Sequence, residues 1–279
     1  MGPNGNRRHH CTTLKWLAGF FGLFVFLALA RAEISPPWLA GLTTQKKPGD
    51  FTALENASFR YKFGWLGLKA GEGNVQLFVQ SDGTLKAVAS GGTTGWPRSL
   101  FKLDVTHECT ANRSTFLPIH VSQDERYAFE DVQTTIDFNS RHVVSLRVSS
   151  KNPDAAKPRD LDYSPVFSLE TAFLWVRSQP LNPGEQERMV VWANNSGYLA
   201  TIRVLGREKL RFDGQDRNTI KLDLELQTID MNLELKKHKL FKSGRGWVSD
   251  DALRIPLRVE ADIFIGSVFA ELESYKLGS

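Results

Sequence analysis

The sequence predicts a mainly β protein: one large, curled antiparallel sheet, shaped as a barrel or half-barrel, with one central helix. Apolar residues recur at every second position through most of the chain, and one segment alone shows helical spacing. A sheet of roughly a dozen strands has more apolar surface than one helix can cover. The sheet must therefore curl on itself to bury that surface.

The chain begins with a segment typical of secretory signals. A cationic stretch precedes the apolar run 16–30, and small residues flank Arg31. This order predicts a signal peptide over residues 1–32, with cleavage before Glu33. An uncleaved amino-terminal membrane anchor is the alternative, although the apolar run is shorter than the roughly 20 residues that span a bilayer. We expect the protein to be exported, with the secretion machinery as one of its partners.

The basic character of the chain belongs to this leader. The whole chain carries 35 Lys and Arg against 31 Asp and Glu, and residues 1–32 hold four basic residues and no acidic one. The rest therefore carries 31 basic and 31 acidic residues. A neutral body gives no electrostatic reason to bind nucleic acid. With 41% apolar and 24% charged residues, the chain is neither disordered nor a polytopic membrane protein.

After the leader, the composition predicts a tether and then one domain. Residues 33–54 contain several prolines and a Lys-Lys-Pro-Gly-Asp sequence, which is typical of a flexible linker. Residues 55–277 predict a single antiparallel β domain whose strands alternate between an apolar and a charged face. The charged face of the clearest strands, with Lys221 and Asp223, disfavours an outer-membrane barrel, which needs an apolar band facing lipid.

One segment in the middle of the chain departs from this alternation. Ser164 and Pro165 resemble a helix cap and a first-turn proline, and Phe167 and Phe173 follow at helical spacings. We therefore predict a helix at about 165–178 that joins two β-rich halves.

The sequence contains no recognisable catalytic or metal-binding motif, so we predict no cofactor, no metal and no catalytic site. The most enzyme-like sequence is Ser249-Asp250-Asp251 with Arg254. Two adjacent carboxylates could act as an acid and a base if their surroundings separate their pKa values. The interpretation that we favour is a hairpin turn, in which the aspartates accept bonds from turn amides and Arg254 pairs with one of them.

The two cysteines give little further information about function. Cys11 lies in the leader and Cys109 is the only other cysteine, so no disulfide forms within the exported part of the chain. We expect Cys109 to be an ordinary, partly buried thiol.

These observations leave three hypotheses of function open, and they leave the oligomeric state undetermined. In the first, the curled sheet and the helix enclose an apolar ligand such as a lipid or an acyl chain. The second is a glycan or peptidoglycan hydrolase that uses Asp250, Asp251 and Glu208. The third is an envelope scaffold that binds other proteins through a strand edge or an apolar patch. The candidate ligand-binding side chains of the first hypothesis are Trp96, Phe167, Phe173 and Trp175.

Three strings of the chain occur together in the order found in one family. They span residues 61–71, 168–177 and 247–257. With them, the chain resembles the bacterial exported family called domain of unknown function 3108, over roughly residues 55–275. The residues that carry the resemblance are Tyr61, Trp65, Gly67, Gly71, Arg177, Trp247, Ser249, Asp250, Asp251, Arg254 and Pro256.

The resemblance implies a Gram-negative envelope or periplasmic protein with a mainly antiparallel fold, and it supplies no established activity. The helix segment of the family usually opens with Asp-Pro, whereas this chain has Ser168-Leu169, which puts the start of the helix in question. The chain is also similar, more distantly, to the half-barrel proteins that carry lipoproteins across the periplasm. That similarity implies a lipid or a lipoprotein as a partner.

Overall fold

The computed structural model describes residues 36–44, 47–49, 55–212, 214–264 and 266–278. The chain from Pro36 onward forms one compact unit. The predicted signal peptide and its cleavage site before Glu33 lie outside the described residues. No helix of the described part is long and apolar enough to span a membrane.

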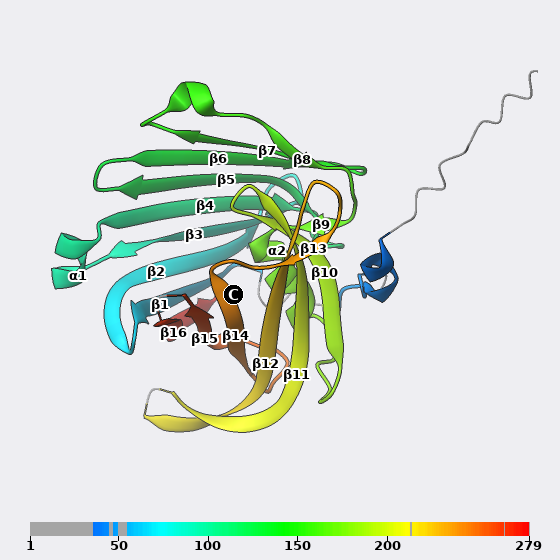
Figure 1. Ribbon diagram of the computed structural model, residues 1–279. Coiled ribbons are helices and arrows are strands. Elements are labelled where there is room, and N and C mark those ends of the chain that lie inside the picture. Colours follow the sequence, from blue (N-terminus) through cyan, green and yellow to red (C-terminus); the bar gives the residue numbers. More distant parts are fainter. Residues whose placement is uncertain (1–35, 45–46, 50–54, 213, 265, 279) are drawn as a thin grey trace, which may run out of the picture. The chain divides into compact units, whose positions relative to one another are not determined.

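The predicted fold class is confirmed: the described residues form one curled, almost wholly antiparallel sheet of 16 strands (Figure 1). The strands of its first half are β1 (Ala57–Trp65), β2 (Leu68–Val79), β3 (Leu85–Thr93), β4 (Leu103–Ala111), β5 (Pro118–Tyr127), β6 (Asp131–Phe138), β7 (Val143–Ser149) and β8 (Arg159–Leu161). The strands of its second half are β9 (Val166–Phe167), β10 (Gln186–Ala193), β11 (Ser196–Phe212), β12 (Gln215–Ile229), β13 (Leu235–Lys237), β14 (Phe241–Ser249), β15 (Pro256–Ile263) and β16 (Gly266–Leu277).

The first and the last strand of the chain join the two halves of the sheet. β1 pairs with β16, from Ala57 opposite Leu277 to Trp65 opposite Val268. From this junction the strands follow in sequence order to β8 on one side and, in reverse order, to β9 on the other. The edges β8 and β9 form no ladder with each other in the described structure, so the sheet is curled but not closed. Only residues 162–165 connect these two edges.

The alternating sequence pattern explains which face of the sheet is buried. On β12, Ile220 and Leu222 are buried in the core, whereas the alternating residues Lys221 and Asp223 are partly exposed on the other face. Because successive side chains of a strand point to opposite faces, one face packs inward and the other meets water.

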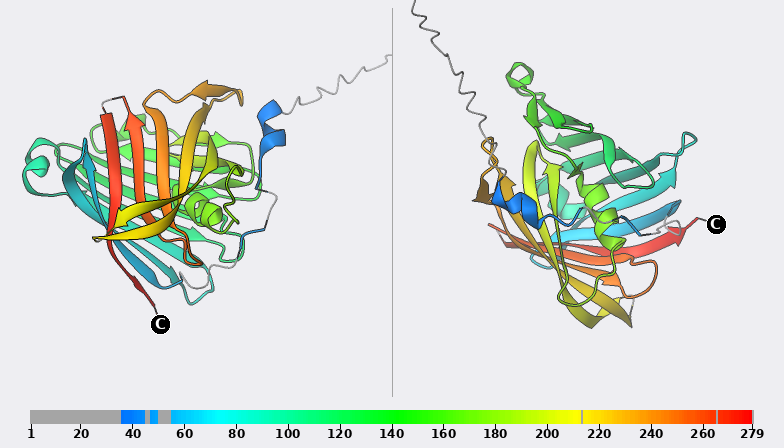
Figure 2. Two further views of the ribbon diagram at one scale, coloured as in Figure 1. Left: turned by 90° about the horizontal axis from the view of Figure 1, so that it is seen from below. Right: turned by 90° about the vertical axis from the view of Figure 1, so that its right-hand side faces the viewer.

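The predicted helix is present as α2 (Leu169–Arg177), but it begins four residues later than expected. Val166 and Phe167 instead form β9, which pairs in parallel with β10. The helix cap is Ser168, not Ser164: Ser168 Oγ accepts a bond from the Thr171 amide at 3.2 Å, and the Ser168 amide donates to Thr171 Oγ1 at 3.0 Å. This reciprocal pair is a capping box. Figure 2 shows α2 between the two halves of the curled sheet.

The described part of the chain holds three further short helices. The α-helix α1 (Gly95–Leu100) lies in the stretch between β3 and β4, and the two 3₁₀ helices are η1 (Pro37–Gly41) and η3 (Pro153–Ala155).

Part of the segment that the sequence predicts to be a tether is docked on the sheet. Trp38 is buried, and its Nε1 donates to the Leu233 carbonyl at 2.9 Å. The Thr43 amide donates to the Arg188 carbonyl at 3.0 Å, and the Arg188 amide donates to Thr43 Oγ1 at 2.8 Å. The two bonds between Thr43 and Arg188 cover part of the edge of β10 that β9 is too short to cover.

Candidate functional site

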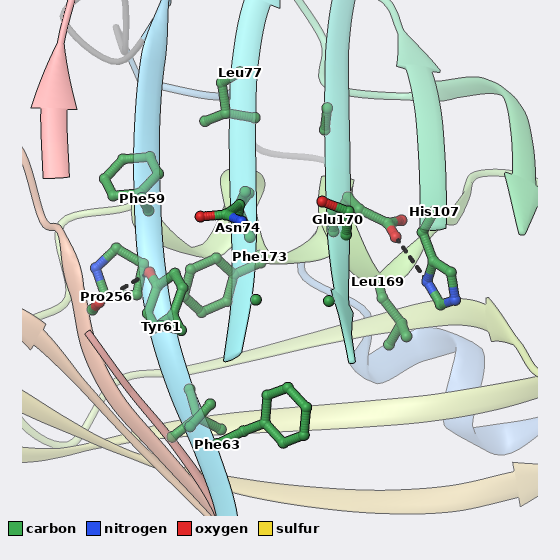
Figure 3. A pocket seen from close by; sticks show the side chains of 18 of the residues that line it. Phe59, Tyr61, Phe63, Asn74, Leu77, His107, Leu169, Glu170, Phe173 and Pro256 are labelled. Atoms are coloured by element: carbon green, nitrogen blue, oxygen red, sulfur yellow. Dashed lines mark hydrogen bonds and ion pairs between the residues drawn. The ribbon is translucent and has the colours of Figure 1, made fainter. Parts of the chain in front are cut away.

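A cavity of about 450 Å³ lies between α2 and the concave face of strands β1 to β4 (Figure 3). Its wall is mainly apolar. The apolar side chains that line it include Phe59, Phe63, Val75, Leu77, Ala87, Ala89, Val105, Leu169, Phe173 and Leu174.

Small residues on the inward face of β3 make room for this cavity. Ala87, Ala89 and Gly91 are spaced by two and all line it, so they share the face of β3 that α2 covers. A larger side chain at these positions would reach toward α2. On β2, a Cβ atom added to Gly71 would overlap the Gly92 carbonyl oxygen of β3 and the Phe63 ring, so only glycine leaves Phe63 its place in the wall.

Two ionisable side chains face each other on one side of the cavity. His107 Nδ1, on β4, lies 3.8 Å from Glu170 Oε1, in the first turn of α2. His107 Nε2 and Glu170 Oε2 are both buried and have no hydrogen-bond partner among the described residues. Buried polar atoms are nearly always bonded, so this pair offers hydrogen-bonding capacity inside an apolar cavity.

A buried arginine lines the cavity farther along α2. Arg177 is 2% exposed, and burial lowers the pKa of its guanidinium to about 10. Its Nη2 donates to the Leu253 carbonyl at 3.0 Å, and its guanidinium lies 5.6 Å from the centre of the Phe173 ring. Next to it, the Tyr61 hydroxyl donates to the Pro256 carbonyl at 3.1 Å, and burial raises the pKa of Tyr61.

The residues of the family strings meet at this end of α2. Arg254 donates to the carbonyls of Arg177 at 3.5 Å, of Pro180 at 3.0 Å and of Gln179. It therefore satisfies backbone oxygens that the end of the helix leaves without intrahelical partners. Together with the bonds from Arg177 and Tyr61, Arg254 attaches the segment after β14 to both α2 and β1.

The three candidate catalytic carboxylates are engaged in structural contacts and do not line the cavity. Asp251 Oδ1 accepts bonds from the Ser249 hydroxyl and from the amides of Leu253 and Arg254, at 2.8 to 3.1 Å. This is the turn chemistry that the sequence favours, except that the guanidinium of Arg254 binds carbonyls at and just after the end of α2 instead of an aspartate.

The other two carboxylates bind side chains on neighbouring strands. Asp250 pairs with Arg207 at 3.0 Å. Glu208 accepts a bond from Trp247 Nε1 at 2.6 Å and pairs with Lys221 at 3.2 Å, and these bonds lower the pKa of Glu208.

Of the four predicted ligand-binding aromatics, only Phe173 lines the cavity. Phe167 and Trp175 are each 1% exposed and pack against each other, with ring centres 6.0 Å apart. Trp175 lies two residues from Phe173, which places it on another side of the helix and outside the cavity wall. Trp96 is 64% exposed on α1 and lies outside the cavity wall.

Several cavity residues were not expected from the sequence, among them Ala89, Gly91, His107 and Glu170. The sequence signal that could have indicated this cavity is the run of small residues at alternate positions of β3.

Cys109, two residues from His107, is buried, and burial together with the nearby Glu170 charge raises its pKa to about 12. Among the residues that the structure describes, no group of three or more His, Cys, Asp or Glu could hold a metal ion.

Comparison with known proteins places the chain in a family. The model of the family described as "Protein of unknown function (DUF3108)" matches residues 58–273. No curated protein matches the chain.

The solved structures that are similar to this chain include two at 8% identity. The β-barrel-like protein of DUF1849 from Brucella abortus has a TM-score of 0.55 and covers 81% of this chain and 99% of its own. A protein with a YmcC-like fold from Bacteroides fragilis has a TM-score of 0.35 and covers 82% of this chain and 97% of its own. The first of these supports the β-barrel-like fold. The family match spans most of the sheet described above, and the chain belongs to the DUF3108 family.

Proposed function

We propose that this protein is an envelope protein, exported to the periplasm, that binds an apolar ligand such as a lipid or a lipoprotein acyl chain between α2 and β1 to β4. The observation that carries this proposal is the apolar cavity of about 450 Å³. Ligand pockets typically measure about 300–1,000 Å³ and are mostly apolar with a few polar groups. Each methylene that leaves water for such a wall contributes about 0.8 kcal/mol, which favours an acyl chain over a polar ligand.

The polar groups of the wall support an amphiphile as the ligand. Phe59, Leu77 and Ala87, at the buried end of the cavity, are suited to a hydrocarbon tail. The unbonded Glu170 Oε2 and His107 Nε2 are suited to a hydroxyl or amide group of the same molecule. An apolar ligand with one hydrogen-bonding group uses both parts of the cavity.

The proposed location rests on the amino-terminal sequence. A cationic stretch, a short apolar run and small residues around Arg31 support export with cleavage before Glu33. Amino-terminal sequencing of protein from the periplasmic fraction tests this: a start at Glu33 supports the proposal, and a start at Met1 favours the membrane-anchor alternative.

Filling the cavity tests the proposed ligand binding. Ala89→Phe places an aromatic ring in the space that faces α2, so we expect the affinity for a fluorescent fatty-acid probe to fall at least about tenfold, as the ring displaces several bound methylenes. Val88→Phe is the matched control, because Val88 lies on the same strand but outside the cavity wall. The control should bind the probe as the unchanged protein does.

Two further measurements complete this test. Thermal unfolding of both variants establishes that each is folded, so that lost binding can be assigned to the filled cavity. Native mass spectrometry of the protein purified from the envelope should reveal a bound amphiphile. Equal probe binding by Ala89→Phe and the unchanged protein, with no bound amphiphile, would contradict the proposal.

A further inference from the structure

Large apolar side chains are exposed at one end of the sheet, in connections between strands that are neighbours in the sheet. The connections are the β1–β2 turn, α1 between β3 and β4, the β5–β6 turn and the β15–β16 turn. We call this surface the apolar rim; its residues are Trp65, Leu66, Trp96, Leu100, Phe129 and Phe264. Leu100 is 79% and Phe129 87% exposed, although side chains of these types are usually buried.

Backbone and ring contacts hold these connections side by side. The Leu66 amide donates to the Ser267 carbonyl at 2.9 Å, which joins the β1–β2 turn to the start of β16. The Thr94 amide donates to the Ala70 carbonyl at 2.9 Å, which places α1 beside the start of β2. Phe101, after α1, contacts Tyr127, before the β5–β6 turn, with ring centres 6.0 Å apart. Figure 1 shows α1 and the β1–β2 and β5–β6 turns at its left.

The opposite end of the same strands has a different composition. The β2–β3 turn is Gln-Ser-Asp-Gly-Thr at 80–84, and the β6–β7 turn is Asn-Ser-Arg-His at 139–142. In the β4–β5 connection, Phe116 is buried. Exposed apolar side chains therefore gather in the connections at one end of the sheet. Single exposed apolar residues are normal on a protein surface, but they would be scattered over both ends.

The cavity opens toward the apolar rim. Phe63, Val105 and Val259 line its wall at this end, where each is at least partly exposed and Val259 is 39% exposed. Phe59 and Leu77 line the other end and are buried. Phe63 lies two residues before Trp65, so the cavity wall continues along β1 into the rim.

We propose that the apolar rim docks on the surface of an anionic lipid bilayer. Indole rings such as those of Trp65 and Trp96 favour the interface between lipid headgroups and acyl chains. Next to Trp96 and Leu100, Arg98 is paired with Asp104 at 2.7 Å, so Lys102 is the cation of the stretch from Gly95 to Leu103 that remains to complement anionic headgroups. When the rim is docked in this way, the open end of the cavity faces the membrane.

Vesicle co-sedimentation tests this proposal. The protein used begins at Glu33, which keeps the compact unit from Pro36 onward and removes the apolar leader, itself able to bind lipid. The vesicles are phosphatidylethanolamine and phosphatidylglycerol at 3:1, compared with pure phosphatidylcholine. We expect binding to the anionic vesicles that weakens with added salt. The triple variant Trp65→Ser, Trp96→Ser and Leu100→Ser should partition at least about a hundredfold less, because each large apolar side chain contributes about tenfold or more.

The control variant carries Ile119→Ser and Leu205→Ser, which change exposed apolar residues away from the rim. It should bind vesicles as the unchanged protein does, and unfolding temperatures should establish that both variants are folded. Failure of the unchanged protein to bind, or equal binding by the triple variant, would overturn the proposal. A dimer in solution that the triple variant converts to a monomer would also overturn it, because the rim would then be a contact between copies. The fatty-acid assay reports ligand binding separately, so either proposal can fail alone.

Discussion

At the scale of single residues, Arg254 connects the turn after β14 to the end of α2, which is distant from it in sequence. Its guanidinium donates to the carbonyl of the last residue of α2 and to two carbonyls that follow the helix, and its amide donates to Asp251 in the turn after β14. The nearby bond from Tyr61 to Pro256 extends the connection to β1. The bonds of Arg254 therefore help to hold in place the helix that forms a wall of the cavity.

Arg254→Ala should lower the free energy of unfolding by about 2–4 kcal/mol, because it removes the donor from the carbonyls of two buried residues, Arg177 and Gln179. Arg254→Lys should recover only part of this loss, since an ammonium group cannot replace a planar guanidinium across several oxygens. Urea unfolding measures both changes. Arg245→Ala is the control: its ion pair with Asp262, at 3.5 Å, is exposed, and we expect a loss of less than about 1 kcal/mol. An equal loss in Arg254→Ala and Arg245→Ala would contradict this role.

At the scale of elements, α2 depends on a cap inside the protein. Ser168 is 1% exposed, bonds Thr171 in the capping box and lies 3.4 Å from the Cys109 thiol on β4. Ser168→Ala removes the acceptor for the Thr171 amide.

We expect Ser168→Ala to cost about 1 kcal/mol of stability, the usual effect of a lost cap, and to weaken fatty-acid probe binding, because Glu170 lies in the first turn. Urea unfolding and the probe assay measure the two effects. Ser81→Ala, in the exposed β2–β3 turn, should change neither. Unaltered stability in Ser168→Ala would show that α2 does not need its cap.

The elements also show how far the sequence could predict this structure. Strands such as β12 were predictable, since a period of two assigns Leu222 inward and Lys221 outward without knowledge of any partner. The start of α2 was not, because Val166 and Phe167 fit a helix as well as a strand, and their pairing with β10 is decided by distant residues. The turn chemistry of Asp251 follows from local sequence, whereas the contacts of Arg254 with the end of α2 depend on tertiary structure.

The cavity was predictable only in general terms. An excess of apolar sheet surface over helix predicts a concave apolar site, and Phe173 lies in it. The roles of Trp175 and Trp96 were not predictable, because residue type does not tell an aromatic of the core from one at an exposed turn. His107 and Glu170 meet only because the helix crosses β4, which has no local signal in the sequence.

At the scale of the whole molecule, charge pairs on the outer face make stability depend on pH. Bonds from Lys69 and Arg60 lower the pKa of Glu72, and a bond from Arg98 lowers the pKa of Asp104. A carboxylate whose pKa is lower in the folded state binds protons more weakly than in the unfolded chain. The contribution of such a carboxylate to the free energy of unfolding is complete when the pH is above its pKa in the unfolded chain, which is 4.5 for Glu72 and 3.8 for Asp104. The contribution is lost as the pH falls through the lower pKa of the folded state.

We therefore expect the free energy of unfolding to change little from pH 7 to pH 5 and to fall below about pH 4.5. Urea unfolding at a series of pH values measures this. The double variant Glu72→Gln and Glu208→Gln should show a shallower fall, because two of the shifted carboxylates are gone. Stability that increases from pH 5 to pH 3 would contradict the prediction.

The pairing of β1 with β16 also sets the order in which this molecule can assemble. The other long strands pair with strands nearby in the chain, so each half can form from successive hairpins while it is still separate. The junction between Ala57 and Leu277 closes a loop of most of the chain, the slowest and entropically most demanding step for a sheet of this kind. Since β16 follows all the other described strands in the chain, the two halves stay unjoined until it has been synthesised, and a variant that lacks Gly266–Leu277 has no strand with which to connect them.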